Sequence, residues 1–320
     1  MIETLIPFIL VAHVPIDTYD VYYGSQYTFN LSNTMEYNFG NVTQHVNVVA
    51  KLKCGNSGAY SLVCSVTDAS RQWYQETGMN SAYSENPRYV KFPIFDVGPF
   101  QILFKDGKIH RVFVDATQAK NSQRIVIAEI AELLNIWWTN LDESQKGLLS
   151  VIDYKFPRSA LAVCQSMIKF TKQKKIDKRM VNFKISSVGR RLKINSGVTY
   201  HFRKSQGSHL PCSKGTYLLY DRDNVQPIVM NRTQIKAKSS FSRIIMSEDE
   251  FVSFTENVAN YCPDEVAHNQ GKCHYNIHQR ISLTLDSITK ATTDLPTITA
   301  PTDVFMSLES TLVSFLIITR

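Results

Sequence analysis

The chain has 320 residues, of which 43% are hydrophobic and 20% are charged, and this is the composition of an ordinary globular protein. The formal net charge of +7 is unevenly spread, because the segment from Lys169 to Lys193 holds ten basic residues and one acid. The remainder of the chain is slightly acidic, which excludes a protein that is basic over its whole surface. We therefore expect one basic patch, and no nucleic-acid-binding module surrounds it.

The first 18 residues contain a candidate signal peptide. Their apolar run from Leu5 to Ala12 is typical of a signal-peptide core, whereas Glu3 stands where a basic residue is expected and Pro7 interrupts the run. Both interpretations of residues 1–18, a signal peptide or part of the folded protein, stay open. The apolar run from Leu312 to Ile318 is much shorter than the roughly 20 residues that span a bilayer, so we expect no membrane span.

Residues 27–31, 46–54 and 60–66 alternate apolar with polar side chains, which predicts an antiparallel sheet with one buried face. If residues 55–59 form the loop, Cys54 lies opposite Tyr60 and Cys64 opposite Ala50. Cys54 and Cys64 are then about 13 Å apart, at about 3.3 Å per residue. A disulfide needs Cα atoms within about 7 Å, so these cysteines pair only in a different register. Buried free thiols and partners elsewhere remain alternatives.

Residues 98–114 (GPFQILFKDGKIHRVFV) predict a β-hairpin, because Asp106-Gly107 tolerates the positive φ angles of a tight turn. Phe100, Ile102 and Phe104 share one face of the first strand, with Leu103 on the other. In the second strand, the alternation places Val112 and Val114 on one face, and Ile109 and Phe113 on the other. Both faces are partly apolar, so another part of the molecule must cover each of them.

Residues 122–138 change to the spacing of a helix that is apolar almost all round. A narrow polar stripe consists of Glu129, Glu132 and Asn135. A helix of this kind is normally buried on most sides, and one buried helix among many strands predicts a sheet wrapped around it. The expected core positions of the helix are Ile127, Ile130, Leu133, Leu134 and Trp137.

Alternation returns in residues 180–202, and further strands are predicted at 216–220, 240–245 and 278–285. Residues 292–302 are rich in Thr and Pro, which is typical of a linker. We therefore predict one domain over residues 19–290, followed by a linker and a truncated tail over residues 291–320.

The order of these features is specific. Paired strands from Tyr19 precede the GPFQILFKDGKI hairpin, then come a buried helix with Asn121 ahead of it, a cysteine followed by YLLYD, and a second cysteine in ANYC. This order resembles the amino-terminal domain of the large lipid transfer proteins, the family of vitellogenins, apolipoprotein B and microsomal triglyceride transfer protein. It looks most like an insect-type vitellogenin, over about residues 19–285.

The resemblance implies a mainly β (α+β) fold in which an antiparallel β-barrel wraps around the central helix. It also implies a lipid-transport or storage domain without a cofactor, which takes phospholipid or neutral lipid as cargo in the full-length protein. Family members continue into a helical domain and further sheets that line the lipid cavity. No polyserine tract is present.

The cysteine pairing rests on the same resemblance. Cys212 and Cys262 are similar to the family's bridged pair in the later part of the barrel. Six cysteines allow 15 connectivities, and a Cys164–Cys273 pair is what remains if Cys54 meets Cys64. With six cysteines, three glycosylation sequons favour a secreted glycoprotein, and they begin at Asn30, Asn41 and Asn231.

The basic stretch is the best candidate for a binding site. Receptors of yolk proteins resemble the low-density lipoprotein receptor, whose acidic, calcium-bound repeats recognise exposed lysines, and a cluster of like charge attracts an acidic partner over a long range. The expected receptor contacts are Lys172, Lys174, Lys175, Lys178 and Arg179. A solvated loop without a dedicated partner is the alternative.

Metal and enzyme sites are not expected. The spacing of Cys262, His268, Cys273, His274 and His278 fits no zinc motif, so disulfides and surface histidines explain these residues better. The sequence has no G-x-S-x-G, no H-E-x-x-H, no phosphate-binding glycine loop and no dinucleotide fingerprint. Trp137 and Trp138 suit either the core or a lipid contact at a barrel mouth.

Two other functions stay open. One is an extracellular signalling or matrix-interaction protein that uses the barrel as a binding module. The other is an intracellular domain that docks a second subunit, as in the triglyceride transfer protein.

Overall fold

The computed structural model describes residues 3–6, 10–13, 25–58, 61–77, 88–105, 108–117, 120–135, 148–152, 166–175, 180–181, 183–187, 195–206, 217–219, 228–230, 235–262, 275–291 and 295–304. Besides helix α1 (Asn121–Leu133) and the 3-10 turn η1 (Pro93–Phe95), the regular elements among these residues are strands. The strands are β1 (Glu3–Ile6), β2 (Leu10–His13), β3 (Ser25–Phe39), β4 (Val42–Gly58), β5 (Ser61–Thr77), β6 (Val90–Lys91), β7 (Phe100–Lys105), β8 (Lys108–Asp115), β9 (Leu148–Ile152), β10 (Ser166–Lys174), β11 (Lys184–Ser187), β12 (Val198–Gln206), β13 (Tyr217–Leu219), β14 (Ile228–Met230), β15 (Ile235–Ser247), β16 (Glu250–Tyr261), β17 (Tyr275–Lys290) and β18 (Pro301–Asp303).

Most of these strands belong to one large antiparallel sheet. Its order is β18-β8-β7-β5-β4-β3-β17-β16-β15-β12-β10-β9, with β6 beside β5. Closing a barrel would require the edge strands β18 and β9 to join, and within the described part of the chain they do not pair. The mainly β fold with one buried helix is confirmed, whereas the described strands form an open sheet and not the closed barrel that we expected.

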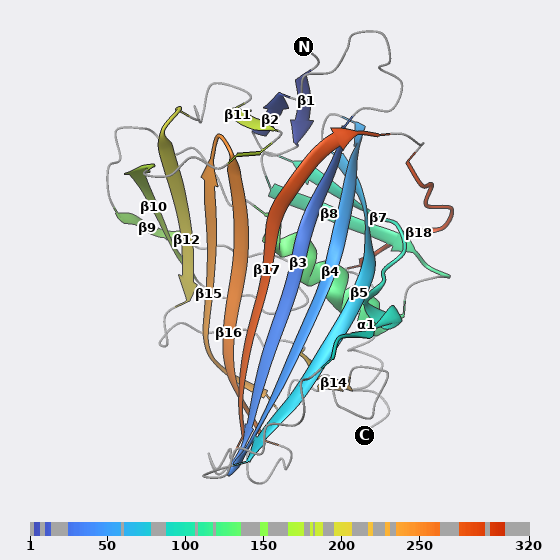
Figure 1. The fold of residues 1–320 in the computed structure, drawn as a ribbon, viewed down its shortest axis with the longest axis vertical. Coiled ribbons are helices and arrows are strands. Elements are labelled where there is room, and N and C mark those ends of the chain that lie inside the picture. The colour runs from blue at the N-terminus through green and yellow to red at the C-terminus, as the bar shows by residue number, and fades with distance from the viewer. Residues whose placement is uncertain are drawn as a thin grey trace.

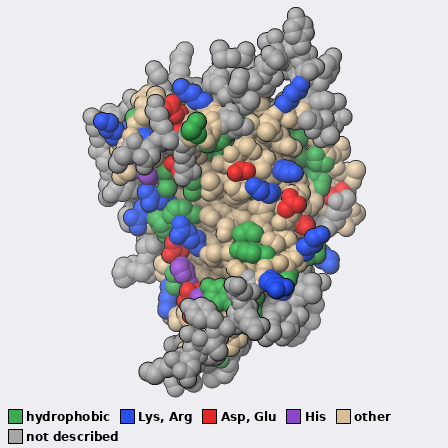
Figure 2. Space-filling view, in the orientation of Figure 1, with side chains coloured by type: hydrophobic (Ala, Val, Ile, Leu, Met, Phe, Trp, Pro, Cys, Tyr) green, Lys and Arg blue, Asp and Glu red, His purple; other side chains and the backbone are tan. Residues whose placement is uncertain are grey.

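The sheet curves around α1. The helix contacts β8 near one edge of the sheet and also β16 and β17, which lie several strands away in the sheet order. One helix reaches both places only if the sheet bends around it. Figure 1 shows α1 behind the long strands β3 and β4, inside this curve. Figure 2 shows the outer face of the same strands, where polar and charged side chains surround small groups of hydrophobic ones.

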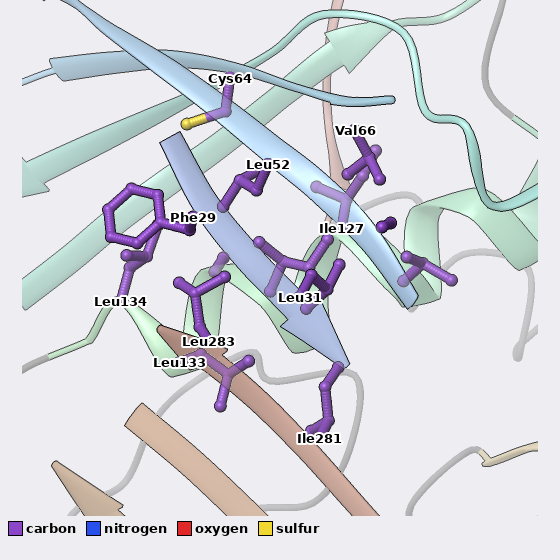
Figure 3. Close-up of a cluster of buried hydrophobic side chains, with 14 of the residues drawn as sticks. Phe29, Leu31, Leu52, Cys64, Val66, Ile127, Leu133, Leu134, Ile281 and Leu283 are labelled. Atoms are coloured by element: carbon purple, nitrogen blue, oxygen red, sulfur yellow. The ribbon is translucent and has the colours of Figure 1, made fainter. Parts of the chain in front are cut away.

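The buried core joins α1 to the inner face of the sheet (Figure 3). Four of the five predicted helix positions are confirmed as core, with exposed fractions of 0% for Ile127 and Ile130, 1% for Leu133 and 2% for Leu134. Trp137 lies outside the described residues, and α1 ends at Leu133 rather than at Trp138. No helix in the described parts of the chain is long and apolar enough to cross a bilayer.

The predicted hairpin is confirmed as β7 and β8, with one difference in its faces. A register shift between Leu103 and Phe104 places Phe104 opposite Ile109. As a result Ile109 is buried with Val112 and Val114, although simple alternation places it on the other face. A β-bulge causes this difference, because one extra residue in a strand reverses the facing of the residues beyond it.

The predicted register of Cys54 and Cys64 is wrong. The two residues lie directly opposite each other, with a Cα–Cα distance of 4.1 Å, and they form a disulfide. The difference arises because β4 continues through the expected loop to Gly58, with a register shift after Asn56. A glycine suits this stretch of strand, since a Cβ atom at position 55 would overlap the side chain of Leu295.

Part of the predicted linker packs onto the sheet. Strand β18 pairs with β8, and Val304 has an exposed fraction of 0%. Thr299 Oγ1 donates a hydrogen bond of 2.6 Å to Asp115, which also accepts bonds from Thr117. These bonds, with Thr117 contributing most, hold the pKa of Asp115 below its usual range. Residues 295–304 are therefore attached to the edge of the sheet, while the division into a domain and a linker stays a prediction.

Strands β1 and β2 pair antiparallel, and β2 pairs with β11. Cleavage of a signal peptide after residue 18 would remove both strands from this small sheet. The signal peptide stays a prediction.

The core around α1 predicts a difference between two truncations. Ile130→Ala removes buried methyl and methylene groups from a residue with 0% exposure, so we expect the free energy of unfolding to fall by about 2–5 kcal/mol. Val90→Ala is the control, because Val90 is 53% exposed and its truncation should cost less than about 0.5 kcal/mol. Urea unfolding measures both values, and equal losses would contradict the burial of α1.

Candidate interaction site on the basic strand

The basic stretch enters the sheet as strand β10, which pairs with β12 and β9. Lys172 and Lys174 lie opposite Tyr200 and Val198, and both lysines are exposed. The Lys172 Nζ lies 5.8 Å from the ring centroids of Phe170 and Tyr200, a distance at which a cation is attracted to an aromatic face. Two of the predicted contacts therefore present charge on one face of a strand.

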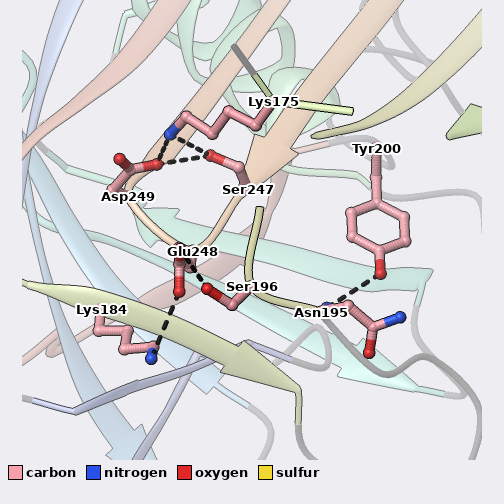
Figure 4. Close-up of polar contacts among 8 residues, drawn as sticks. All are labelled: Lys175, Lys184, Asn195, Ser196, Tyr200, Ser247, Glu248 and Asp249. Atoms are coloured by element: carbon pink, nitrogen blue, oxygen red, sulfur yellow. Dashed lines mark hydrogen bonds and ion pairs between the residues drawn. The ribbon is translucent and has the colours of Figure 1, made fainter. Parts of the chain in front are cut away.

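Lys175 is buried, although we expected it to be an exposed receptor contact. Its Nζ pairs with Asp249 and lies 3.2 Å from the hydroxyl of Ser247, and its side chain is only 8% exposed (Figure 4). A buried ammonium needs such a partner, because its desolvation is costly. Lys175 therefore anchors the end of β10 to the β15–β16 turn and does not present its charge to a receptor. Lys178 and Arg179 lie outside the described residues.

The turn between β15 and β16 neutralises a second cation of the stretch. Glu248 lies 3.3 Å from the Nζ of Lys184 and accepts a hydrogen bond of 2.9 Å from the Ser196 hydroxyl. The Ser196 bond is the largest cause that lowers the pKa of Glu248, while burial opposes it and Lys184 lowers it further. The backbone amide of Ile185 also donates to the carbonyl of Glu248 at 2.6 Å. The acidic turn, residues 247–249, thus organises the basic segment (Figure 4).

A buried polar cluster lies between α1 and the sheet. Gln279 Nε2 donates to Glu129 Oε1 at 3.2 Å and lies 3.4 Å from Asn33 Oδ1. Asn257 Nδ2 donates to Gln279 Oε1 at 3.4 Å. All four residues are at most 8% exposed, so the polar stripe expected on α1 does not face solvent at Glu129.

Burial raises the pKa of Glu129 to about 7, and the hydrogen bond from Gln279 opposes this shift. The second carboxylate oxygen, Oε2, has no hydrogen-bond partner among the described residues. The cluster can therefore hold a proton at neutral pH. The sequence did contain a signal for it, because Gln279 interrupts the inward-facing series Ile277, Ile281 and Leu283 on β17.

The cysteines and histidines for which disulfides and surface positions were expected, and no metal site, are only partly described. His278 Nε2 lies 2.9 Å from Glu256 Oε1, and Cys262 belongs to a disulfide whose partner is outside the described residues. In the part of the chain that the structure describes, no three His, Cys, Asp or Glu side chains gather to hold a metal. His268, Cys273 and His274 lie outside that part, as do Cys164 and Cys212.

Two of the three sequon asparagines, Asn30 and Asn41, are exposed, and Asn231 is outside the described residues. Asn30 donates to Asp286 at 3.2 Å and accepts from Lys51 at 2.6 Å, so its amide is already engaged. Glycosylation at the three positions stays a prediction.

Comparison with known proteins yields a structural likeness only. No protein-family model matches the chain, and no curated protein matches it. Among solved structures it is similar to the one described as lipid–protein interactions in lipovitellin, with a TM-score of 0.55 and 9% sequence identity. The match covers 89% of this chain and 28% of that chain. The chain therefore has a lipovitellin-like fold and spans less than a third of the lipovitellin chain.

The raised pKa of Glu129 predicts how stability depends on pH. The folded protein keeps a proton up to a pH of about 7, whereas the unfolded chain releases it near 4.5, so stability falls as the pH rises through this window and is constant above it. At about 1.36 kcal/mol per pKa unit, the loss amounts to roughly 3 kcal/mol. Glu129→Gln keeps an acceptor for Gln279 but does not titrate, so the variant should lack this loss.

Urea unfolding at pH 5 and pH 8 measures the effect. The control is Asp286→Asn, because the side chain of Asp286 is 43% exposed and pairs with a lysine rather than with a histidine, so its substitution should leave the pH dependence as in the wild type. A Glu129→Gln variant with the wild-type pH dependence would show that this carboxyl group is not the source.

Proposed function

We propose that this chain is a non-catalytic domain of a secreted, vitellogenin-like lipid-transport or storage protein, and that its basic strand binds a receptor or partner protein. One observation carries the proposal. The chain, whose described residues form a curved antiparallel sheet around one buried helix, is similar in structure to lipovitellin over 89% of its length. Likeness of fold alone does not specify a function, so the proposal needs a direct test for lipid and one for receptor binding.

Secretion is supported by two features. The Cys54–Cys64 disulfide is of a kind that persists in oxidising compartments, and the sequon residue Asn41 is exposed beside the β3–β4 turn. Cytosolic chains rarely keep such a bridge, whereas the lumen of the endoplasmic reticulum also preserves it, so the disulfide does not separate secretion from the subunit-docking alternative.

Lipid content tests the transport function. We expect phospholipid or neutral lipid to remain bound when the 320-residue chain is purified from a secreting eukaryotic host. Organic extraction followed by mass spectrometry measures the molar ratio of lipid to protein. An unrelated secreted protein, purified in parallel, gives the background. A chain with no lipid above this background would refute transport by the chain and favour the extracellular binding-module alternative.

Charge reversal tests the receptor surface. Lys172 and Lys174 are exposed on β10, so the double variant Lys172→Glu/Lys174→Glu should weaken binding to acidic, calcium-loaded receptor repeats by about tenfold or more. Surface plasmon resonance measures the Kd.

The matched control is Lys53→Glu/Lys105→Glu, which changes the net charge equally at exposed positions of β4 and β7. Equal weakening by both double variants would indicate a general effect of charge. Unchanged binding by the β10 variant would remove this strand as the contact.

A further inference from the structure

Three arginines gather on the outer face of the sheet. They are Arg203 on β12, Arg243 on β15 and Arg280 on β17. Successive side chains of a strand point to opposite faces, and Tyr200 shares its face with Lys172 through the β10–β12 register. Arg203 is an odd number of residues from Tyr200, so the arginines lie on the face opposite to Lys172 and Lys174. This surface is therefore distinct from the proposed receptor site.

The arginines carry charge that the described residues do not neutralise. Arg203 and Arg243 are direct cross-strand neighbours, an arrangement that destabilises a sheet when the charges are alike. None of the three arginines has a carboxylate within 4.0 Å among the described residues. Of the nearby acids, Glu256 lies directly opposite Arg280 in the register but bonds to His278 at 2.9 Å, and Glu250 acts electrostatically on His201. A partner that supplies carboxylates would relieve this repulsion.

Aromatic rings hold two of the guanidinium groups in place. The Cζ atom of Arg203 lies 4.6 Å from the ring centroid of Phe241, and that of Arg280 lies 4.5 Å from the centroid of Phe254. The two rings themselves pack edge to face at 5.7 Å. A guanidinium that is already ordered on a ring loses less conformational freedom when it binds a ligand.

The third guanidinium is held by a neutral base. Arg243 Nη2 lies 3.0 Å from His201 Nδ1. Burial, and then the charge of Arg243, lowers the pKa of His201, so the neutral ring accepts this hydrogen bond at neutral pH. The three cations are thus fixed in position although no acid among the described residues forms an ion pair with them.

We propose that this arginine–phenylalanine surface, formed by Arg203, Arg243, Arg280, Phe241 and Phe254, binds an acidic polypeptide segment of a partner protein. Arginine forms paired hydrogen bonds with a carboxylate, and ordered arginines beside aromatic rings are frequent centres of protein interfaces. Figure 2 shows hydrophobic side chains beside Lys and Arg side chains over β15 and β16. Phe254 is only 8% exposed and lies beneath the guanidinium of Arg280, which favours a protein ligand over insertion into a membrane.

A fluorescently labelled peptide of alternating Glu and Gly residues tests the proposal. A second peptide, in which Gln replaces each Glu, is the neutral control. Fluorescence anisotropy should show binding of the acidic peptide that weakens with salt, and little binding of the neutral one. Arg203→Gln and Arg280→Gln should each weaken binding about tenfold, as expected for loss of a hydrogen bond to a charged group. Arg203→Lys/Arg280→Lys keeps the charge and should restore only part of the affinity.

Three outcomes would overturn the proposal. The first is unchanged peptide binding in Arg203→Gln/Arg280→Gln. The second is an equal loss in Lys53→Gln/Lys105→Gln, which removes the same charge elsewhere. The third is arginine-dependent binding to vesicles of phosphatidylserine without binding to the peptide. Circular dichroism confirms that each variant is folded, and a smaller loss of peptide binding in Lys172→Gln/Lys174→Gln than in Arg203→Gln/Arg280→Gln separates this surface from the proposed receptor site.

Discussion

The fold depends on the burial of one apolar helix by one sheet. Because α1 has apolar side chains on nearly all sides, covering a single stripe of it would leave large hydrophobic groups in water. The sheet therefore meets the helix from β8 and again from β16 and β17. Such curvature in long strands requires local breaks in regular pairing, and register shifts occur at Val49/Lys51, Ala237/Ser239 and Leu285/Ser287.

Wrapping a helix in this way also traps the few polar groups that it carries. Glu129 cannot turn toward solvent, because β3, β16 and β17 supply the buried amides around it. The Gln279 amide, which Asn33 and Asn257 hold in place, satisfies one carboxyl oxygen and leaves the other without a partner among the described residues, so the neutral form of the acid is favoured. A leucine would pack there without this cost. The cluster therefore buries an ionisable side chain at a position where an apolar one would be more stable. Such positions are more frequent at sites with a role beyond packing.

The sequence predicted what depends on local pattern and missed what depends on distant contacts. The β7–β8 hairpin and the helix core followed from alternation, from Asp106-Gly107 and from helical spacing. The Cys54 register failed because a bulge in β4 is invisible in a period-two pattern. Strand β16 escaped notice because Ser253 and Asn257 occupy inward positions. Strand β10 escaped notice because the exposed Lys172 and Lys174 lie on the same face of the sheet as the buried Tyr200. Whether β9 meets β18 is a property of the whole sheet, which no segment encodes by itself.

Of the candidate site, the sequence located the basic stretch but could not tell Lys175, which is buried in an ion pair, from its exposed neighbours.

The fold, and not the local density of basic residues in the sequence, determines which positive charges have an acidic partner. Lys175 and Lys184 belong to the same basic stretch as Lys172, yet the acidic turn at residues 247–249 pairs with both. On the outer face, by contrast, Arg203 and Arg243 face each other with no described acid between them. If solubility were the only requirement, the acids would be better placed beside the arginines. Ion pairs on an exposed face cost no stability, whereas like charges on neighbouring strands reduce it. The acids instead stabilise the turn that holds β10, and the unpaired cations stay where a second protein can reach them.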